Sequence, residues 1–296
     1  MSVQAQTEAF FLPSPSPAGG QRFCIYHRAA GNTVRGQLLY IHPLAEEMNK
    51  SRRMAAVQAR ALAAAGYAVL QIDLLGCGDS SGDFGDATWS AWIDDVVAAC
   101  QWLRSQPAPG KEVAPDEPAP LWLWGLRAGC LLAVDAARKL AEPCHFLFWA
   151  PAPAGKPLLQ QFLRLKVAGD MLAGNAKGVM DGLRARLAMG NAVEIAGYAL
   201  SPGLASGLEQ ADLSPPGPPG PPNSPARVEW LELSTRDPAA ATLAPVAAQA
   251  QARWQQAGYS VGSHLVTGPS FWQTAELEDA PALISATIAA ITGRSA

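Results

Sequence analysis

The stretch that decides the fold is LWLWGLRAGCLLAVDAARKL, Leu121–Leu140. Its apolar run over 121–126 is typical of a buried β-strand, and the residues that follow favour a helix. Gly125 and Gly129 flank the turn between these elements. Glycines at such a reversal let strand and helix approach closely, while the residue between them points outward. That residue is Arg127, so the sequence predicts a guanidinium group at the tip of a sharp strand-to-helix turn.

Short apolar runs alternate with helix-compatible stretches on both sides of this turn, which indicates βαβ units and a mainly parallel sheet. Further strands are expected at 36–43, 67–73, 145–151, 228–234 and 259–268. Helices are expected at 51–66, 88–106, about 240–257 and about 277–291. Thr88 is a suitable N-cap residue for the second of these helices.

The alternation stops after Pro151. Residues 152–213 hold amphipathic helical segments and no convincing central strand, which favours a helical cap inserted into the α/β unit. Residues 214–226 are rich in proline and glycine and predict a stiff, exposed linker or a disordered loop. The α/β pattern then resumes, so we assign 1–151 and 227–296 to one core domain.

The composition of the 296 residues excludes several classes of protein. The net charge of −3 offers no broad basic field for a nucleic-acid backbone, so no nucleic-acid partner is expected. The N-terminal residues lack the pattern of a signal peptide, and no run of about 18 apolar residues could span a bilayer. We therefore expect a cytoplasmic protein without an integral membrane segment.

Cysteine usage bears on metals and disulfides. The five cysteines are odd in number and scattered, without a C-x-x-C pair. This pattern argues against a disulfide framework or a zinc site. The sequence therefore predicts no metal, and no cofactor is expected.

A strand, a Gly-x-Arg-x-Gly turn and a helix between other βα units match the context of the nucleophile elbow in the α/β-hydrolase fold. We therefore expect that fold, with a mostly parallel central sheet flanked by helices and with the helical cap. An elbow of this kind normally presents a serine. Arg127 has no lone pair with which to attack a carbonyl group, and it is always charged.

Beyond the elbow, the sequence resembles the α/β-hydrolase-like proteins associated with bacterial exosortase A systems, in particular the type called hydrolase 2. The resemblance rests on HPLAEEMNKSRR (42–53), DLLGCGDSSGDFGDATWSAW (73–92), WGLRAG (124–129) and GPSFWQTAELEDAPAL (268–283). It implies an α/β-hydrolase fold with a cap and a gene context of exopolysaccharide production and PEP-CTERM protein sorting. Partner proteins of that system are implied, and no proven substrate is.

The catalytic triad of the fold maps onto this chain incompletely. Asp237 follows a late strand, where the acid is usual, but the loop 267–274 contains no histidine. With Arg127 at the elbow, we expect an atypical or catalytically inactive hydrolase that binds a small acyl or anionic ligand or a partner protein. One alternative is an active esterase, thioesterase or acyltransferase with a relocated nucleophile, either Ser80 in GDSSG or Cys77 with a lowered pKa. Another is a purely structural partner whose cap docks on a second protein.

Residues from neighbouring loops are expected to complete the site around Arg127. Glu46 or Glu47 is expected to form an ion pair with Arg127, because the fold brings their loops together. Leu126 and Ala128 flank Arg127 and are expected to contact the ligand. His42 lies in the loop that supplies an oxyanion-hole amide in hydrolases, although its ring could simply bond the local backbone. Phe271 and Trp272, in the loop that lacks histidine, could plug the pocket or form an apolar wall for an acyl chain.

Overall fold

A computed structural model describes residues 6–14, 19–107, 119–172, 178–221, 225–236, 242–274 and 276–293, with the backbone alone for 170–172. In these residues the central sheet has eight strands. Their bounds are β1 (Thr7–Pro13), β2 (Gln21–His27), β3 (Gly36–Ile41), β4 (Tyr67–Ile72), β5 (Leu121–Leu126), β6 (His145–Trp149), β9 (Arg227–Ser234) and β10 (Ser260–Thr267). The order across the sheet is β1-β2-β4-β3-β5-β6-β9-β10.

The sheet is parallel from β4 to β10, and only β1 and β2 run antiparallel to their neighbours. The parallel strands are those expected from the sequence, whereas β1 and β2 were not expected. β1 is largely exposed, so it lacks the continuous apolar run of a buried strand. Phe10 of β1 packs on Trp102 with ring centroids 4.4 Å apart, which fixes this hairpin against the helix that carries Trp102.

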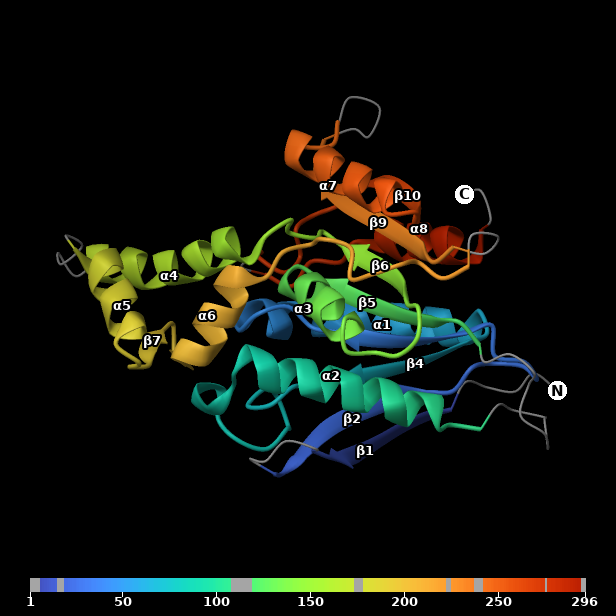
Figure 1. Ribbon diagram of the computed structural model, residues 1–296, viewed down its shortest axis with the longest axis horizontal. Coiled ribbons are helices and arrows are strands. Elements are labelled where there is room, and N and C mark those ends of the chain that lie inside the picture. The colour runs from blue at the N-terminus through green and yellow to red at the C-terminus, as the bar shows by residue number, and fades with distance from the viewer. Residues whose placement is uncertain are drawn as a thin grey trace.

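Helices cover both faces of the sheet (Figure 1). One face packs against α1 (Glu46–Ala64) and α8 (Pro281–Thr292). The other packs against α2 (Trp89–Arg104), α3 (Ala128–Ala137) and α7 (Pro245–Gln256). Alternate residues of each strand enter the two hydrophobic cores, as the two-residue period of a strand requires. The expected mostly parallel sheet flanked by helices is therefore confirmed.

Two helix starts bear on the sequence predictions. The Oγ1 atom of Thr88 accepts a hydrogen bond from the Ala91 N–H at 3.1 Å, so Thr88 is the N-cap of α2 as expected. In contrast, α1 begins at Glu46 and not at Ser51. The earlier start places Glu46 and Glu47 in the first turn of the helix, where the free N–H groups and the helix dipole favour acidic side chains.

The segment after β6 extends beyond one end of the sheet (Figure 1). It contains α4 (Gly155–Leu172), α5 (Val179–Ala188), the short strands β7 (Val193–Ile195) and β8 (Tyr198–Leu200), and α6 (Pro202–Gln210). The β7–β8 hairpin was not expected, but it forms its own small sheet and adds no strand to the central one. Residues 214–221 and 225–226 contain no helix or strand. The division into core, cap (152–213) and linker (214–226) stays a prediction.

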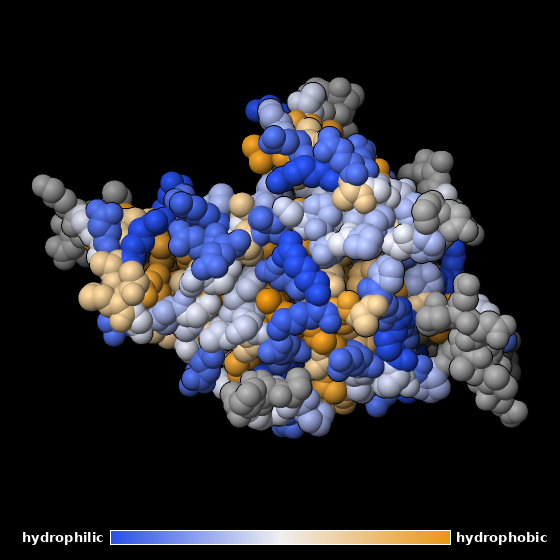
Figure 2. Space-filling view, in the orientation of Figure 1, coloured by the Kyte–Doolittle hydropathy of each residue, from blue (hydrophilic) through white to orange (hydrophobic). Residues whose placement is uncertain are grey.

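The face of the molecule shown in Figure 2 is largely polar, and its hydrophobic side chains gather in small, separate patches. Among the described residues, no helix is both long and apolar enough to cross a membrane.

His145, at the start of β6, predicts a pH effect on stability. Its ring stacks on Trp122 at 4.7 Å, and its Nδ1 atom accepts a hydrogen bond from the Arg227 N–H at 2.9 Å. Burial, assisted by the charge of Arg227, lowers the pKa of His145 from 6.5 to about 4. The unfolded chain therefore binds more protons between these two pKa values, so stability is lost as the pH falls from 6.5 towards 4.

Between pH 7 and pH 5, we expect His145 to account for a loss of about 2 kcal/mol in the free energy of unfolding. Urea unfolding of the wild type and of His145→Gln at both pH values measures this contribution. The variant should lose less stability than the wild type over this interval. Equal losses would contradict the role given to His145.

Candidate ligand site at the strand-to-helix turn

The turn between β5 and α3 has the strained geometry of a nucleophile elbow. Arg127 has φ 54° and ψ −115°, a backbone conformation that costs a residue other than glycine about 1–3 kcal/mol. A Cβ atom on Gly125 would lie 2.5 Å from the Cys130 nitrogen, and one on Gly129 would lie 2.2 Å from the Ile41 oxygen. Both glycines are therefore required where the sequence predicted close approach, and the elbow presents Arg127.

The side chain of Arg127 is held by groups from three directions. Its Nε and Nη2 atoms both donate to Oε1 of Glu47 at 3.4 Å. Nη2 also donates to Oε1 of Gln161, on α4, at 2.9 Å. The guanidinium carbon lies 5.8 Å from the ring centroid of Trp272, within range of a cation–π contact. The expected ion pair thus forms with Glu47, although both nitrogens share one oxygen and the bidentate geometry is not reached.

Carboxyl groups outnumber guanidinium groups around the elbow. Burial raises the pKa of Glu47, the positive charge of Arg127 opposes this shift, and Glu46 adds to it. Burial also raises the pKa of Glu46, while a hydrogen bond from its own backbone N–H and the charge of Lys50 partly oppose that shift. On β9, burial raises the pKa of Glu232, while a hydrogen bond from Trp230 and the charge of Arg127 oppose it. A further positive charge beside these carboxyl groups would stabilise their ionised forms.

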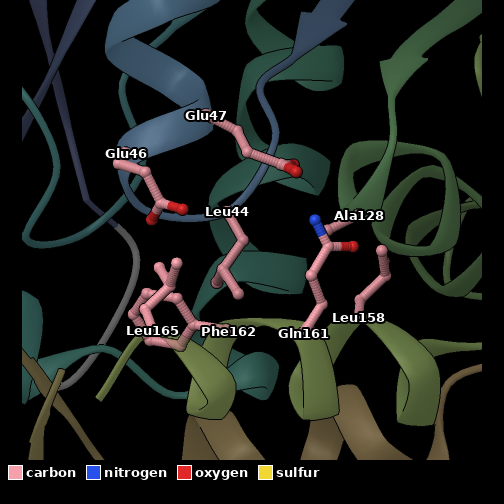
Figure 3. A pocket seen from close by; sticks show the side chains of 8 residues that line it. All are labelled: Leu44, Glu46, Glu47, Ala128, Leu158, Gln161, Phe162 and Leu165. Atoms are coloured by element: carbon pink, nitrogen blue, oxygen red, sulfur yellow. The ribbon is translucent and has the colours of Figure 1, made fainter. Parts of the chain in front are cut away.

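A cavity of about 30 Å³ lies between the elbow and α4. Figure 3 shows Glu46 and Glu47 on one side, with side chains of α4 facing them from the other. The lining combines the apolar residues Leu44, Ala128, Leu158, Phe162 and Leu165 with the polar residues Glu46, Glu47 and Gln161. The volume holds about one water molecule, so a larger ligand requires side chains of α4 to move.

Phe271 and Trp272 are packed into the core beside Arg127. Phe271 is 0% exposed and Trp272 is 5% exposed. Their rings meet edge to face at 5.1 Å, and Phe271 contacts Trp149 in the same way at 6.2 Å. Of the two roles considered for these residues, the packing favours the one in which they fill the pocket over the one in which they form an open apolar wall for an acyl chain. Leu126 is likewise buried in the core between the sheet and α1, whereas Ala128 lines the cavity.

His42 is buried at the end of β3. Its Nδ1 atom lies 2.8 Å from the carbonyl oxygen of Pro43, and its Nε2 atom accepts a hydrogen bond from the Leu74 N–H at 3.3 Å. Burial lowers the pKa of His42. The ring is therefore neutral at physiological pH, with the proton on Nδ1, and it bonds the local backbone.

The alternative nucleophiles, Ser80 and Cys77, are both buried within the loop after β4. The Ser80 Oγ atom donates to the Asp73 carbonyl oxygen at 2.5 Å and accepts from the Phe23 N–H at 2.9 Å, so the backbone occupies it. Burial raises the pKa of the Cys77 thiol, contrary to the lowered pKa that a thiol nucleophile needs, and Arg127 is not among the charges that affect it. Asp237 lies outside the described residues.

Sequence reasoning missed two partners of the elbow, Gln161 and Gln273. Gln161 bonds Arg127 from α4, and Gln273, in the loop after β10, is near enough to Glu47 to lower the pKa of its carboxyl group. Neither belongs to a recognisable motif, because each contact depends on how the cap and the last loop pack. Within the described residues, no group of three or more histidine, cysteine or acidic side chains is arranged to hold a metal ion.

Comparison with known proteins shows which family this chain belongs to. Human protein ABHD12B is 29% identical over 127 residues, which are 42% of this chain and 30% of that protein. The chain thus spans less than a third of the length of that relative. Its fold resembles Est1E from Butyrivibrio proteoclasticus, solved with ferulic acid, with a TM-score of 0.64, 13% identity and coverage of 97% and 99% of the two chains.

A second solved structure also has a similar fold. Mouse alpha/beta hydrolase domain-containing protein 10 is similar with a TM-score of 0.53, 15% identity and 97% coverage of both chains. At such identities the likeness shows the fold alone. Residues 32–192, more than half of the chain, match the family described as serine aminopeptidase, S33. The chain belongs to this family of α/β-hydrolases.

Proposed function

We propose that this chain is an atypical α/β-hydrolase that binds a ligand at the elbow and does not cleave esters through an elbow nucleophile. The observation that carries the proposal is Arg127, which occupies the strained elbow position and is ion-paired with Glu47. A guanidinium group cannot attack a carbonyl carbon. Acyl transfer loses its covalent route without a nucleophile and a general base, and only positioning and oxyanion stabilisation remain.

The lining of the cavity bears on the class of ligand. Leu158, Phe162 and Leu165 supply an apolar wall from the cap, which suits an acyl or alkyl chain. The anionic ligand considered from the sequence is less favoured. Arg127 is already engaged by Glu47 and Gln161, and an anion would face the carboxyl groups of Glu46 and Glu47.

We also propose that the ligand or a partner protein belongs to the exosortase A and PEP-CTERM system, with its exopolysaccharide production. This part of the proposal rests on the resemblance of the four sequence stretches from 42 to 283. It includes the third possibility raised by the sequence, in which the cap docks on a second protein of that system.

The proposal predicts that the purified protein is not labelled by a fluorophosphonate probe and does not hydrolyse short or long chromogenic acyl esters. An active serine hydrolase serves as the positive control, and mass spectrometry maps any modified residue. Ser80→Ala is the matched variant for the relocated nucleophile. Stoichiometric labelling at Ser80, with turnover lost in Ser80→Ala, would contradict the proposal.

A further inference from the structure

Glu46 presents a hydrogen-bond acceptor that the protein leaves unused at the elbow cavity. Its Oε2 atom is completely buried and has no hydrogen-bond partner in the part of the chain that the structure describes. The side chain as a whole is half-buried and lies at the wall of the cavity, opposite α4 (Figure 3). Leaving a buried carboxyl oxygen unpaired costs free energy, which a donor on a ligand would recover.

The charges around the cavity determine what kind of donor fits. The hydrogen bonds that Arg127 makes here go to Glu47 and Gln161, and Glu46 Oε2 receives none in the described residues. Lys50 is near enough to act on Glu46 electrostatically, but no hydrogen bond joins them. The described lining of the cavity itself contains two carboxyl groups, Glu46 and Glu47, and no lysine or arginine. A positively charged donor would balance this excess, whereas an anion would increase it.

The opposite wall of the cavity is apolar. Leu158, Phe162 and Leu165 come from α4, and Leu44 comes from the loop before α1. The hydrogen bond from Arg127 to Gln161 joins this wall to the elbow and is exposed to solvent, so a ligand can compete for it. The cavity of about 30 Å³ then has to widen by movement of α4 side chains before an alkyl chain fits. A charged donor at Glu46 and an alkyl chain against α4 could therefore be held by one molecule.

We propose that this site binds a primary ammonium group carried on an apolar chain, with Glu46 accepting the hydrogen bond and α4 covering the chain. The inference rests on the proposed binding function and names its ligand class. It reverses the expectation of an anionic ligand, because the arginine that suggested an anion is already paired inside the protein.

The test compares three probes that differ only in their polar group: n-octylamine, octanoate and n-octanol. Isothermal titration calorimetry at pH 7.5 measures their binding to the full chain. We expect octylamine to bind one-to-one and at least about tenfold more tightly than octanoate, a difference of about 1.4 kcal/mol. Octanol, which has the same chain without the charge, should bind with an intermediate affinity.

Glu46→Gln should lower the affinity for octylamine about tenfold and lower that for octanol much less, because octanol carries no charge. The control variant Glu194→Gln removes an exposed carboxylate from β7 and changes the net charge by the same amount as Glu46→Gln. It should alter neither affinity. Leu165 is 39% exposed, so Leu165→Lys is a second variant that the fold tolerates. Its ammonium group would occupy the rim of the cavity, and octylamine binding should be lost.

Three outcomes would overturn the inference: octanoate binding as tightly as octylamine, no saturable binding of any probe, or unchanged octylamine binding in Glu46→Gln and Leu165→Lys. Non-specific binding to surface carboxylates falls under the last outcome. Failure here is distinct from failure of the proposed function, because fluorophosphonate labelling and ester turnover do not depend on the amine probes.

Discussion

Arg127→Met should lower the free energy of unfolding by about 2–3 kcal/mol at pH 7.5. The variant leaves Glu47, which is 8% exposed, as a buried carboxyl group without its cation. Breaking a buried ion pair from one side typically costs 3–5 kcal/mol. We expect a smaller loss because both N···O distances are long, at 3.4 Å, and because Glu47 can become protonated. Urea unfolding followed by tryptophan fluorescence measures the effect.

The pH dependence of this loss gives it a specific signature. Burial already raises the pKa of Glu47, and removing the charge of Arg127 raises it further. A carboxyl group whose pKa is higher in the folded state binds more protons there, so stability rises as the pH falls towards the unfolded pKa. The deficit of Arg127→Met relative to the wild type should therefore shrink between pH 7.5 and pH 5.

Two further variants separate the ion pair from the backbone strain. Adding Glu47→Gln to Arg127→Met removes the unpaired charge and should restore part of the stability. Arg127→Gly also loses the ion pair, but glycine adopts φ 54° without strain. The Arg127→Gly variant should therefore be about 1 kcal/mol more stable than Arg127→Met. If the free energy of unfolding of Arg127→Met is within about 0.5 kcal/mol of the wild-type value, the ion pair does not stabilise the elbow.

The elbow and the pairing of Arg127 could be predicted because they depend on local pattern and on one rule of topology. The apolar strand and the glycines at 125 and 129 specify the turn over a few residues. Strands β3 and β5 are parallel neighbours, so the loop that follows β3 lies beside the elbow. That rule brings Glu47 to Arg127 without any knowledge of side-chain packing.

The other contacts of the site depend on packing over long distances. Gln161 reaches Arg127 only because α4 lies across the elbow, and the amphipathic pattern of the cap does not specify that orientation. The choice of Glu47 over Glu46 follows from the start of α1 at Glu46, five residues before the expected one. A shift of one residue turns a side chain by about 100° around a helix, so it decides which carboxyl group is left unpaired.

Gly129→Ala should lower the free energy of unfolding by about 4 kcal/mol or more, or leave no soluble protein. The added Cβ would lie 2.2 Å from the Ile41 oxygen and 2.9 Å from the His42 oxygen, so backbone at the end of β3 has to move. Forcing atoms into a closely packed site is destabilising, and here the obstacle is main chain, which cannot rotate away. Soluble yield and urea unfolding measure the effect.

The matched control is Gly182→Ala on α5, where an added Cβ has nothing within 4 Å. Alanine favours a helix over glycine by about 1 kcal/mol, so this variant should be as stable as the wild type or more stable. If Gly129→Ala were as harmless as Gly182→Ala, β3 and α3 would not approach as closely as the structure shows. The collision involves backbone and not the chemistry of residue 127. The elbow therefore imposes its glycines whether it presents a nucleophile or, as in this chain, an arginine.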